Sequence, residues 1–389
     1  GQHGARVRGM TVARVLTIAG SDSGGGAGIQ ADLKTVTMLG GHAMTAITAI
    51  TAQNTLGVQA VMPVPTEIVL AQIDSCLSDI GADAIKLGMI GSAATAHALA
   101  DRLGDVGVPI VFDPVMVATS GGVLADADTI AAFDRLMDVA TVVTPNRPEL
   151  AALGGRDAVL SHHVALFEKG GHGDGDMLHD QLFLFRAGEA VSWTARRIAT
   201  PHTHGTGCTL ASALAIGLAQ GLSLQAAADR ARAFVRLALH EAPGLGGGHG
   251  PMGHQWVRED AMVPGLSLNQ ITIPAHDYAA STAWWRAFGL TQIVDSPGNG
   301  YARFEVDNGA TLSIQVGDAP TGATIYFEVA DLAARCAALD RAGIVLDHDA
   351  RTEPWNWQEA RLTDPGGNGV CLYHAGENRR YPPWRIGDA

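Results

Sequence analysis

The chain is poor in cysteine, in aromatic side chains and in positive charge. Its cysteines, Cys76, Cys208, Cys336 and Cys371, are far apart and form no Cys-x-x-Cys pair, which argues against a disulfide framework and favours a reduced, cytoplasmic protein. The net charge is −13 with no block of Lys or Arg, so we expect no binding to nucleic acid or to an anionic membrane. No apolar run reaches transmembrane length, and the first residues lack the apolar core of a secretory signal.

Glycine, by contrast, is abundant: the 389 residues include 48 glycines, beside a hydrophobic fraction of 47%. This composition is typical of an α/β protein with glycine-rich turns. The length predicts two or three domains with a large core. We interpret residues 1–12 as a tag or a disordered start and leave them out of the fold.

Short apolar runs alternate with helical stretches from residue 15 onward, and this alternation predicts βαβ units in a largely parallel sheet with helices on both faces. The predicted strands are Val15–Ala19, Thr45–Thr51, Ala84–Leu87, Pro109–Phe112, Thr141–Val143 and Val164–Phe167. The predicted hairpin pairs Gln181–Phe185 with Ala190–Trp193, and the predicted helices include Thr209–Ala219 and Leu224–His240.

One crossover looks too short. About ten residues, mostly polar or glycine, separate Leu153 from Val164. A right-handed parallel crossover needs a dozen or more residues, usually with a helix. We therefore favour the interpretation that a segment is missing from the sequence here, rather than that the crossover is unusually short.

The C-terminal third contains an internal repeat. Ile271–Leu290 aligns without gaps on Ile325–Ile344, and each copy has the pattern of a strand, an Asp N-cap, a helix, a Gly stop and further strands. Two copies of this length indicate a duplicated β-α-β-β-β module. We expect a first domain over residues 13–257, a linker over 258–265 and this α+β domain over 266–389.

Residues 202–209, with the sequence HTHGTGCT, are the most informative stretch. Gly205, Thr206 and Gly207 expose backbone N–H groups where a helix begins, and such a terminus attracts anions, phosphate above all. Cys208 lies in the same positive field, which we expect to lower the pKa of its thiol. Together these features suggest phosphoryl transfer. The spacing of His202 and His204 fits no structural zinc site, so we expect no structural metal and a loop-supporting role for His204.

Polar groups also follow several predicted strands. The glycine-rich stretch Ala19–Asp32 is either a tight strand-to-helix turn or a loop that approaches a small substrate, with Asp32 as partner of a hydroxyl or amine. Gln53 faces the ligand crevice or caps a turn. Asp113 and Glu149 suit Mg²⁺ near phosphates, although Glu149 equally fits the first turn of a helix. Lys169 either neutralises phosphoryl oxygens or is a solvated strand-end lysine.

In chain order, the motifs AGSDSGGGAGIQADLKT, TAQNT, IKLGM, FDPVM, TPNRPE, KGGH and HTHGTGCT closely resemble those of hydroxymethylpyrimidine/phosphomethylpyrimidine kinases of thiamine biosynthesis. The resemblance covers roughly residues 14–256. It implies a ribokinase-like three-layer α/β/α sandwich, ATP and Mg²⁺ as cofactors, and a homodimer. The implied reaction is phosphorylation of 4-amino-5-hydroxymethyl-2-methylpyrimidine and of its monophosphate.

The same resemblance assigns roles to individual residues. It places the pyrimidine near Gly20, Asp32, Gln53, Met89 and Val115. It places Mg-ATP across Asn146, Glu149 and Lys169, with Asp113 as a further magnesium-binding acid. Cys208 would be the catalytic base, and the amides of Gly205–Cys208 would stabilise the developing charge. The segment Gly246–Pro251 lacks the lysine that some relatives carry there, so a nucleotide contact from that lysine is not expected.

The duplicated module over about residues 266–374 resembles the vicinal oxygen chelate fold of glyoxalases and bleomycin-resistance proteins, through ITIPAHD, WWRAFGL and DPGGNGVCLYH. The positions that match the metal ligands of that family are Gln270, Thr324, Cys371 and either Ser313 or Gln315. Because this set is poor in strong ligands, we expect no catalytic metal.

Trp284, Trp285, Trp355, Trp357 and Trp384 concentrate aromatic side chains in this domain. They either pack the core and an interface or line a cup for a planar molecule such as a pyrimidine or thiazole.

Two alternative functions stay open. The first is a pyridoxal-type kinase, because the ring and its hydroxymethyl group are similar. The second is a binding protein whose C-terminal domain sequesters a small molecule while the kinase half has decayed. The intact HTHGTGC and KGGH motifs argue against that decay.

Overall fold

The computed structural model describes residues 12–119, 121–171, 175–184, 190–257, 270–307, 310–317, 323–329, 332–354 and 357–374. These residues divide into two compact units, one ending at Val257 and one that contains residues 270–374. Apart from Val12, the predicted start (1–12) and the whole predicted linker (258–265) lie outside the described residues.

The N-terminal unit is built on a twisted sheet of eight strands in the order β10-β9-β8-β7-β6-β5-β1-β2. The strands are β1 (Arg14–Ala19), β2 (His42–Ile47), β5 (Ala84–Leu87), β6 (Ile110–Phe112), β7 (Val142–Val143), β8 (Ala165–Glu168), β9 (Met177–Phe183) and β10 (Ala190–Arg196). Every pairing from β2 to β8 is parallel, whereas β9 and β10 extend one edge as an antiparallel hairpin. The predicted parallel sheet and antiparallel hairpin are confirmed, although β9 begins at Met177, before the predicted Gln181.

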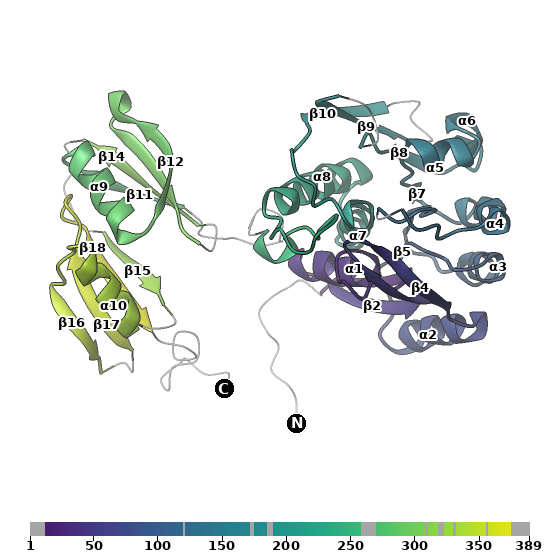
Figure 1. Cartoon of the computed structure of the whole chain (residues 1–389), viewed down its shortest axis with the longest axis horizontal. Helices are drawn as coiled ribbons and strands as arrows, with labels where there is room; N and C mark the ends of the chain where they lie inside the picture. The colour runs from purple at the N-terminus through teal and green to yellow at the C-terminus, as the bar shows by residue number, and fades with distance from the viewer. Residues whose placement is uncertain are drawn as a thin grey trace. The chain divides into compact units, whose positions relative to one another are not determined.

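Helices cover both faces of this sheet (Figure 1). One face packs against α1 (Gly28–Met38), α7 (Thr206–Ala219) and α8 (Leu224–His240). The other packs against α2 (Thr66–Asp79), α3 (Ala93–Leu103), α4 (Ala127–Met137), α5 (Arg147–Ala152) and α6 (Arg156–Leu160). Successive residues of a strand point to opposite faces, so Val15 lies in the first core and Leu16 in the second. The predicted three-layer α/β/α sandwich is confirmed.

The predicted strand Thr45–Thr51 is two strands. β2 ends at Ile47, and β3 (Ala49–Asn54) leaves the sheet to pair with β4 (Gly57–Pro63) in a separate antiparallel ribbon. Thr48 makes the break: its backbone N–H donates to Ala19 and its hydroxyl to the carbonyl of Met89, at 3.0 and 2.6 Å. An apolar run alone could not show this change of direction.

The crossover before Val164 closes with the residues present, and the expected missing segment stays a prediction. The crossover from β7 to β8 contains two short helices, α5 and α6, joined through Gly154 and Gly155. Both glycines have φ near +90°, which permits a turn that other residues adopt at a cost. The crossover looked too short because the count began at Leu153 and left out α5.

The C-terminal unit contains two sheets of identical strand order, β11-β14-β13-β12 and β15-β18-β17-β16. The first module comprises β11 (Gln270–Ala275), α9 (Tyr278–Phe288), β12 (Thr291–Ser296), β13 (Tyr301–Glu305) and β14 (Thr311–Val316). The second comprises β15 (Thr324–Glu328), α10 (Leu332–Arg341), β16 (His348–Thr352), β17 (Gln358–Thr363) and β18 (Gly369–His374). Asp277 caps α9 and Gly289 ends it at φ 109°, as predicted. The duplicated β-α-β-β-β module is therefore confirmed.

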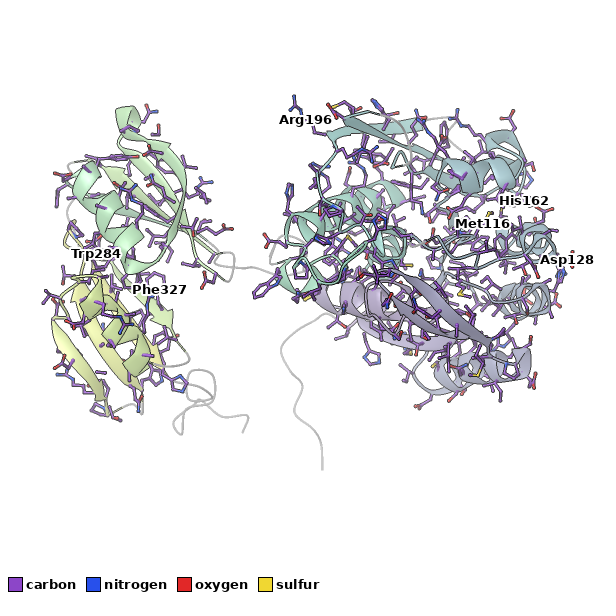
Figure 2. The ribbon with its side chains drawn as sticks, in the orientation of Figure 1. Met116, Asp128, His162, Arg196, Trp284 and Phe327 are labelled. Atoms are coloured by element: carbon purple, nitrogen blue, oxygen red, sulfur yellow. The ribbon has the colours of Figure 1, made fainter. Side chains whose placement is uncertain are left out.

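Aromatic side chains join the two modules. Trp285 is fully buried, and Phe288 and Phe327 pack around it with ring centroids 5.5 and 6.3 Å away. Trp284 stacks on Phe288 at 5.2 Å, and Figure 2 shows Trp284 and Phe327 in this unit. These tryptophans follow the core-packing interpretation.

The remaining tryptophans of this domain are less central. Trp357 stacks on Tyr373 at 4.7 Å on the other side of the second sheet. Trp355 and Trp384 lie outside the described residues.

Across the part of the chain that the structure describes, no helix is both long and apolar enough to cross a membrane.

Candidate active site

The first turn of α7 lies at one end of the site. Its N-cap is Gly205, with φ 86° and no side-chain hydrogen bond to the helix. A Cβ on Gly205 would clash with the carbonyl oxygen of Gly26, so this position requires glycine for close approach as well as for its left-handed backbone. The following Thr206, Gly207 and Cys208 are half-buried. An α-helix leaves its first N–H groups without intrahelical partners, so this turn can receive an anion.

Lys169 and Asp113 meet this turn from the sheet. Lys169 Nζ lies 2.9 Å from the carboxylate of Asp113, and both groups would lie within 3.5 Å of a Cβ on Gly207. The hydroxyl of Thr144 donates to the same carboxylate at 3.1 Å. Burial alone would lower the pKa of Lys169, but Asp113 and Glu149 raise it above its ordinary value. The ammonium group therefore stays charged beside the helix terminus.

Glu149 has two roles. Its carboxylate accepts from the backbone N–H of Asn146 at 2.8 Å while Asn146 caps α5, so the helix-turn interpretation is correct. The same carboxylate lies 4.0 Å from Lys169. Burial raises the pKa of Glu149 to about 6, against the opposing effect of Lys169. Glu149 therefore also belongs to the charged cluster.

The thiol of Cys208 differs from the prediction. Burial raises its pKa to about 11, even though Lys86 and the backbone N–H of Gly28 favour the thiolate. The expectation of a lowered pKa is wrong for the free site, because loss of hydration outweighs the nearby positive charge. At neutral pH the group is a thiol.

Asp32 lies behind the site rather than in it. Both of its oxygens are 2.9 Å from Lys86 Nζ, and Ser212 donates to one of them at 2.5 Å. Asp32 and Lys86 are fully buried. Asp32 accepts three hydrogen bonds from Lys86 and Ser212, a geometry that does not favour its predicted contact with a substrate hydroxyl or amine, which stays a prediction.

The other predicted substrate residues line the strand ends. A Cβ on Gly20 would lie 2.7 Å from the sulfur of Met89, so the two are adjacent. The backbone N–H of Val115 donates to the carbonyl of Asp113 at 2.8 Å, which places Val115 at the edge of the charged cluster. Their contact with a substrate stays a prediction.

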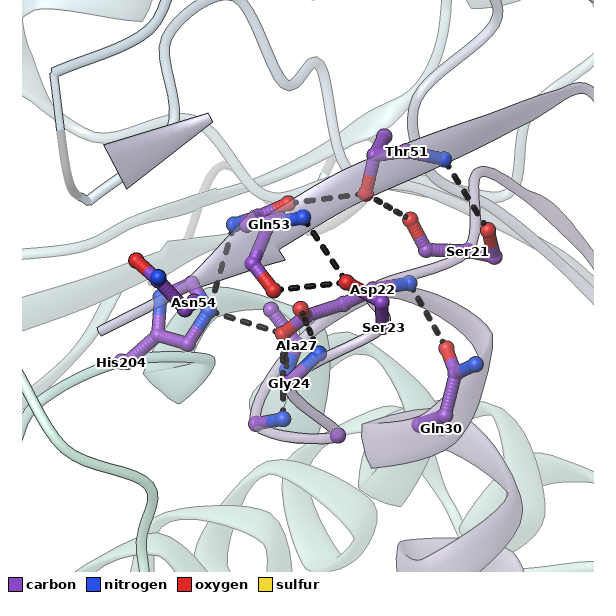
Figure 3. A network of polar contacts seen from close by, with 12 residues as sticks. Ser21, Asp22, Ser23, Gly24, Ala27, Gln30, Thr51, Gln53, Asn54 and His204 are labelled. Atoms are coloured by element: carbon purple, nitrogen blue, oxygen red, sulfur yellow. Dashed lines mark hydrogen bonds and ion pairs between the residues drawn. The ribbon is translucent and has the colours of Figure 1, made fainter. Parts of the chain in front are cut away.

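Gln53 belongs to a buried polar network that Figure 3 shows. His204 Nε2 lies 2.8 Å from Asp22 and 3.3 Å from the side-chain amide of Gln53. Asp22 also accepts from the backbone N–H groups of Gly24, Gly26 and Ala27. The predicted loop-supporting role of His204 is confirmed, since His204 joins its own loop to the glycine-rich loop.

Sequence reasoning missed three residues around the site: Asp22 in the polar network, and Lys86 and Ser212, which hold Asp32 behind the site. A signal for Lys86 was present, because a lysine in the apolar strand AIKL must be buried and therefore paired. Ser212 gave no such signal, since a serine in an alanine-rich helix is unremarkable.

The candidate metal positions of the C-terminal unit are weak ligands. Ser313 and Cys371 are buried, whereas Gln315 and Thr324 are exposed. The side chain of Gln270 lies outside the described set. Among the described residues of both units, no group of three or more His, Cys, Asp or Glu side chains could hold a metal ion.

The fold is that of the ribokinase-like phosphotransferases: an α/β/α sandwich with a glycine-rich loop, a bare helix terminus and a lysine among carboxylates. The chain belongs to the phosphomethylpyrimidine kinase family, whose model matches residues 22–253. A second model, the glyoxalase/bleomycin resistance protein/dioxygenase superfamily, matches residues 267–372.

Individual relatives agree with this assignment. The hydroxymethylpyrimidine/phosphomethylpyrimidine kinase of Streptomyces coelicolor is 45% identical over 64% of this chain and 96% of its own length. That of Rhizobium meliloti is 46% identical over 61% of this chain and 96% of its length. Among solved structures, the ADP complex of Bacillus subtilis pyridoxal kinase is similar with a TM-score of 0.59 and 31% identity, over 64% of this chain and all of that one.

Proposed function

We propose that the N-terminal unit transfers the terminal phosphoryl group of ATP to the hydroxymethyl oxygen of 4-amino-5-hydroxymethyl-2-methylpyrimidine, and then to the monophosphate so formed, in thiamine biosynthesis. The observation that carries this proposal is the position of Lys169 and Asp113 at Gly207, on the first turn of α7. This arrangement brings a fixed cation and bare helix amides to one point, as phosphoryl transfer requires.

In this mechanism the backbone amides at Gly205–Cys208 and the ammonium of Lys169 stabilise the charge on the moving phosphoryl oxygens. The substrate alcohol gives its proton to Cys208, which lies at the same helix turn. Because the pKa of the thiol is about 11, Cys208 must first give its own proton to solvent, and only this thiolate can accept the proton of the alcohol.

The residues fit a magnesium ion. Asp113 and Glu149 supply hard carboxylate oxygens close to the anion site, and Mg²⁺ in kinases is usually held by one or two carboxylates with substrate phosphates. Lys169 alone does not neutralise the two acids, so a net negative charge remains that a bound cation would balance. When bound, the ion would offset the charge of the phosphates.

The test is a phosphoryl-transfer assay with the purified chain, ATP and Mg²⁺. We expect kcat/KM for the aminopyrimidine alcohol to exceed that for pyridoxal. A clear preference for pyridoxal would instead establish the alternative that the pyridoxal kinase relatives raise. Absence of turnover on both alcohols, with retained binding of small molecules, would favour a non-catalytic binding protein.

We also infer a homodimer through the outer face of the β3–β4 ribbon. Ile50 and Met62 are ladder partners on this face and are 47% and 58% exposed, whereas Thr51 and Gln53 point inward. Exposed apolar patches on a ribbon mark an interaction surface. Sedimentation of the wild type and of Met62→Glu should give a dimer and a monomer; a monomeric wild type would refute the inference.

The location that we propose is the cytoplasm. All four cysteines are free thiols, as expected of a protein in a reducing compartment. Fractionation of cells that produce the full chain tests this.

A further inference from the structure

The protonation of His204 follows from its partner. Its Nε2 lies 2.8 Å from the carboxylate of Asp22. Burial alone would raise the pKa of Asp22, but hydrogen bonds from His204 and from the N–H groups of Ala27 and Gly24 hold it below its usual value. Asp22 is thus a carboxylate and can only accept. The imidazole must therefore carry its hydrogen on Nε2.

The amide of Gln53 lies against this same nitrogen. With Nε2 of Gln53 3.3 Å from His204 Nε2, two donors would face each other. The nitrogen and oxygen of a side-chain amide are equal in shape, so the hydrogen-bond partners decide which end is which. The single hydrogen on Nε2 points mainly at Asp22, so Gln53 can share it only in a longer three-centre bond, and only its oxygen can accept there.

The other end of the amide gives the same answer independently. It lies 3.3 Å from the hydroxyl of Thr51, and this hydroxyl has one hydrogen. The hydrogen is committed to the carbonyl oxygen of Ser21, 2.7 Å away, because a carbonyl cannot donate. Thr51 can therefore only accept from Gln53, which selects the nitrogen at this end.

We infer that His204 is a positioning residue that fixes the Gln53 amide with its oxygen toward the imidazole and its nitrogen toward Thr51. The amide then keeps one N–H and one lone pair for a ligand. This pair matches an edge on which a ring nitrogen lies beside an exocyclic amine, the edge that Gln and Asn recognise bidentately in adenine. The selection of an aminopyrimidine rests on the proposed function, whereas the orientation of the amide does not.

Neutron diffraction from deuterated crystals of the free protein tests the orientation directly. We expect deuterium on His204 Nε2 and two deuterium atoms on the Gln53 end that faces Thr51. Deuterium on the Gln53 end that faces His204 would overturn the inference. This measurement holds whichever alcohol the protein phosphorylates.

Kinetics test the role in specificity. The ratio of kcat/KM for the aminopyrimidine alcohol over its analogue without the amine should fall about tenfold in His204→Leu, mainly through KM. The matched control is His202→Leu, because His202 is half-buried in the same loop but outside the network. It should keep the wild-type ratio.

The outcomes separate the possible failures. An equal loss on both alcohols in His204→Leu would mean a merely structural role and would overturn the specificity claim. Wild-type protein that phosphorylates neither pyrimidine would refute the proposed function, and the neutron result would still decide the orientation of the amide.

Discussion

Lys86 Nζ lies 2.9 Å from each carboxylate oxygen of Asp32, and neither side chain is exposed to solvent. Burial alone would lower the pKa of Lys86, but Asp32, Cys208 and Asp113 raise it above its ordinary value. This ion pair joins α1 to β5, and both of its charges act on the thiol of Cys208. Lys86 favours the thiolate of Cys208 and Asp32 opposes it, so the pair adds little net charge at the thiol and is closed to substrate.

Substitution of Lys86 by methionine should destabilise the N-terminal unit strongly. The change leaves Asp32 charged, buried and without its main partner, which typically costs about 3–5 kcal/mol. Urea unfolding measures the loss. Replacing both partners, in Lys86→Met with Asp32→Leu, should recover most of it, because no buried charge is left alone.

The exposed ion pair between Arg135 and Asp101 is the control. Its side chains are 47% and 71% exposed, so Arg135→Ala should change the free energy of unfolding by about 1 kcal/mol or less. If Lys86→Met behaved in the same way, the buried pair would not be a structural element of the site.

Cys208→Ala should lower kcat by about 10²–10⁴-fold, the range for loss of a general base, with little change in KM for the pyrimidine. Single-turnover assays measure the rate and calorimetry measures the binding. Full turnover in this variant would place the base elsewhere.

The raised pKa of Cys208 can be tested separately. Because the pKa is about 11, the alkylation rate of this thiol should still rise with pH at pH 9.5. Mass spectrometry of the modified peptide follows the rate. A plateau near pH 7 would show that the helix field outweighs burial.

The pKa of Glu149, about 6 in the folded protein, lies above the ordinary 4.5. The folded state therefore binds this proton more tightly, and its stabilising contribution is present below pH 4.5 and is lost as pH rises through 6. As pH rises between those limits, the free energy of unfolding of the wild type should fall by about 2 kcal/mol relative to that of Glu149→Gln. Glutamine is suitable because its side-chain oxygen can still accept from Asn146.

Urea unfolding of both proteins from pH 4.5 to 7, without nucleotide, measures this difference. A difference that is independent of pH would mean that Glu149 titrates normally.

Much of the fold was predictable because both cores depend on local patterns. Runs such as Val15–Ala19 are apolar on both faces, which only a sheet covered on both sides tolerates. Gly205 and Lys169 were predictable for a similar reason, since a glycine before an apolar helix and a lysine after a strand are visible in sequence.

The rest depends on contacts between distant segments. Nothing near Asp32 in the sequence shows that Lys86 and Ser212 occupy its oxygens. The pKa of Cys208 depends on how deeply the fold buries the thiol, and sequence gave only the opposing effect of the helix terminus. The sequence therefore identified candidate site side chains, but not their protonation states or their hydrogen-bond partners.

Gly205→Ala should cost activity through two effects. The methyl group would clash with the carbonyl of Gly26 and would also occupy a backbone with φ 86°. We expect kcat/KM for ATP to fall by about 10²-fold or more, the effect of losing one well-placed donor.

The control is Gly221→Ala at the other end of α7, where φ is 84° but no atom lies within 4 Å of the new methyl. It should lose about 1 kcal/mol of stability and no activity. Equal effects of the two would mean that backbone strain alone, not the contact with Gly26, matters.

Trp285→Ala tests whether the two units are energetically independent. Trp285 is fully buried among Phe288 and Phe327, so its removal should destabilise the C-terminal unit by about 3–5 kcal/mol. Because the N-terminal unit has its own cores, its calorimetric unfolding transition and the kinase turnover should not change. Ile293→Ala, at a position 47% exposed, should change neither transition and serves as the control. A loss of turnover in Trp285→Ala, at a temperature where the N-terminal transition is intact, would show that the glyoxalase-like unit supports catalysis.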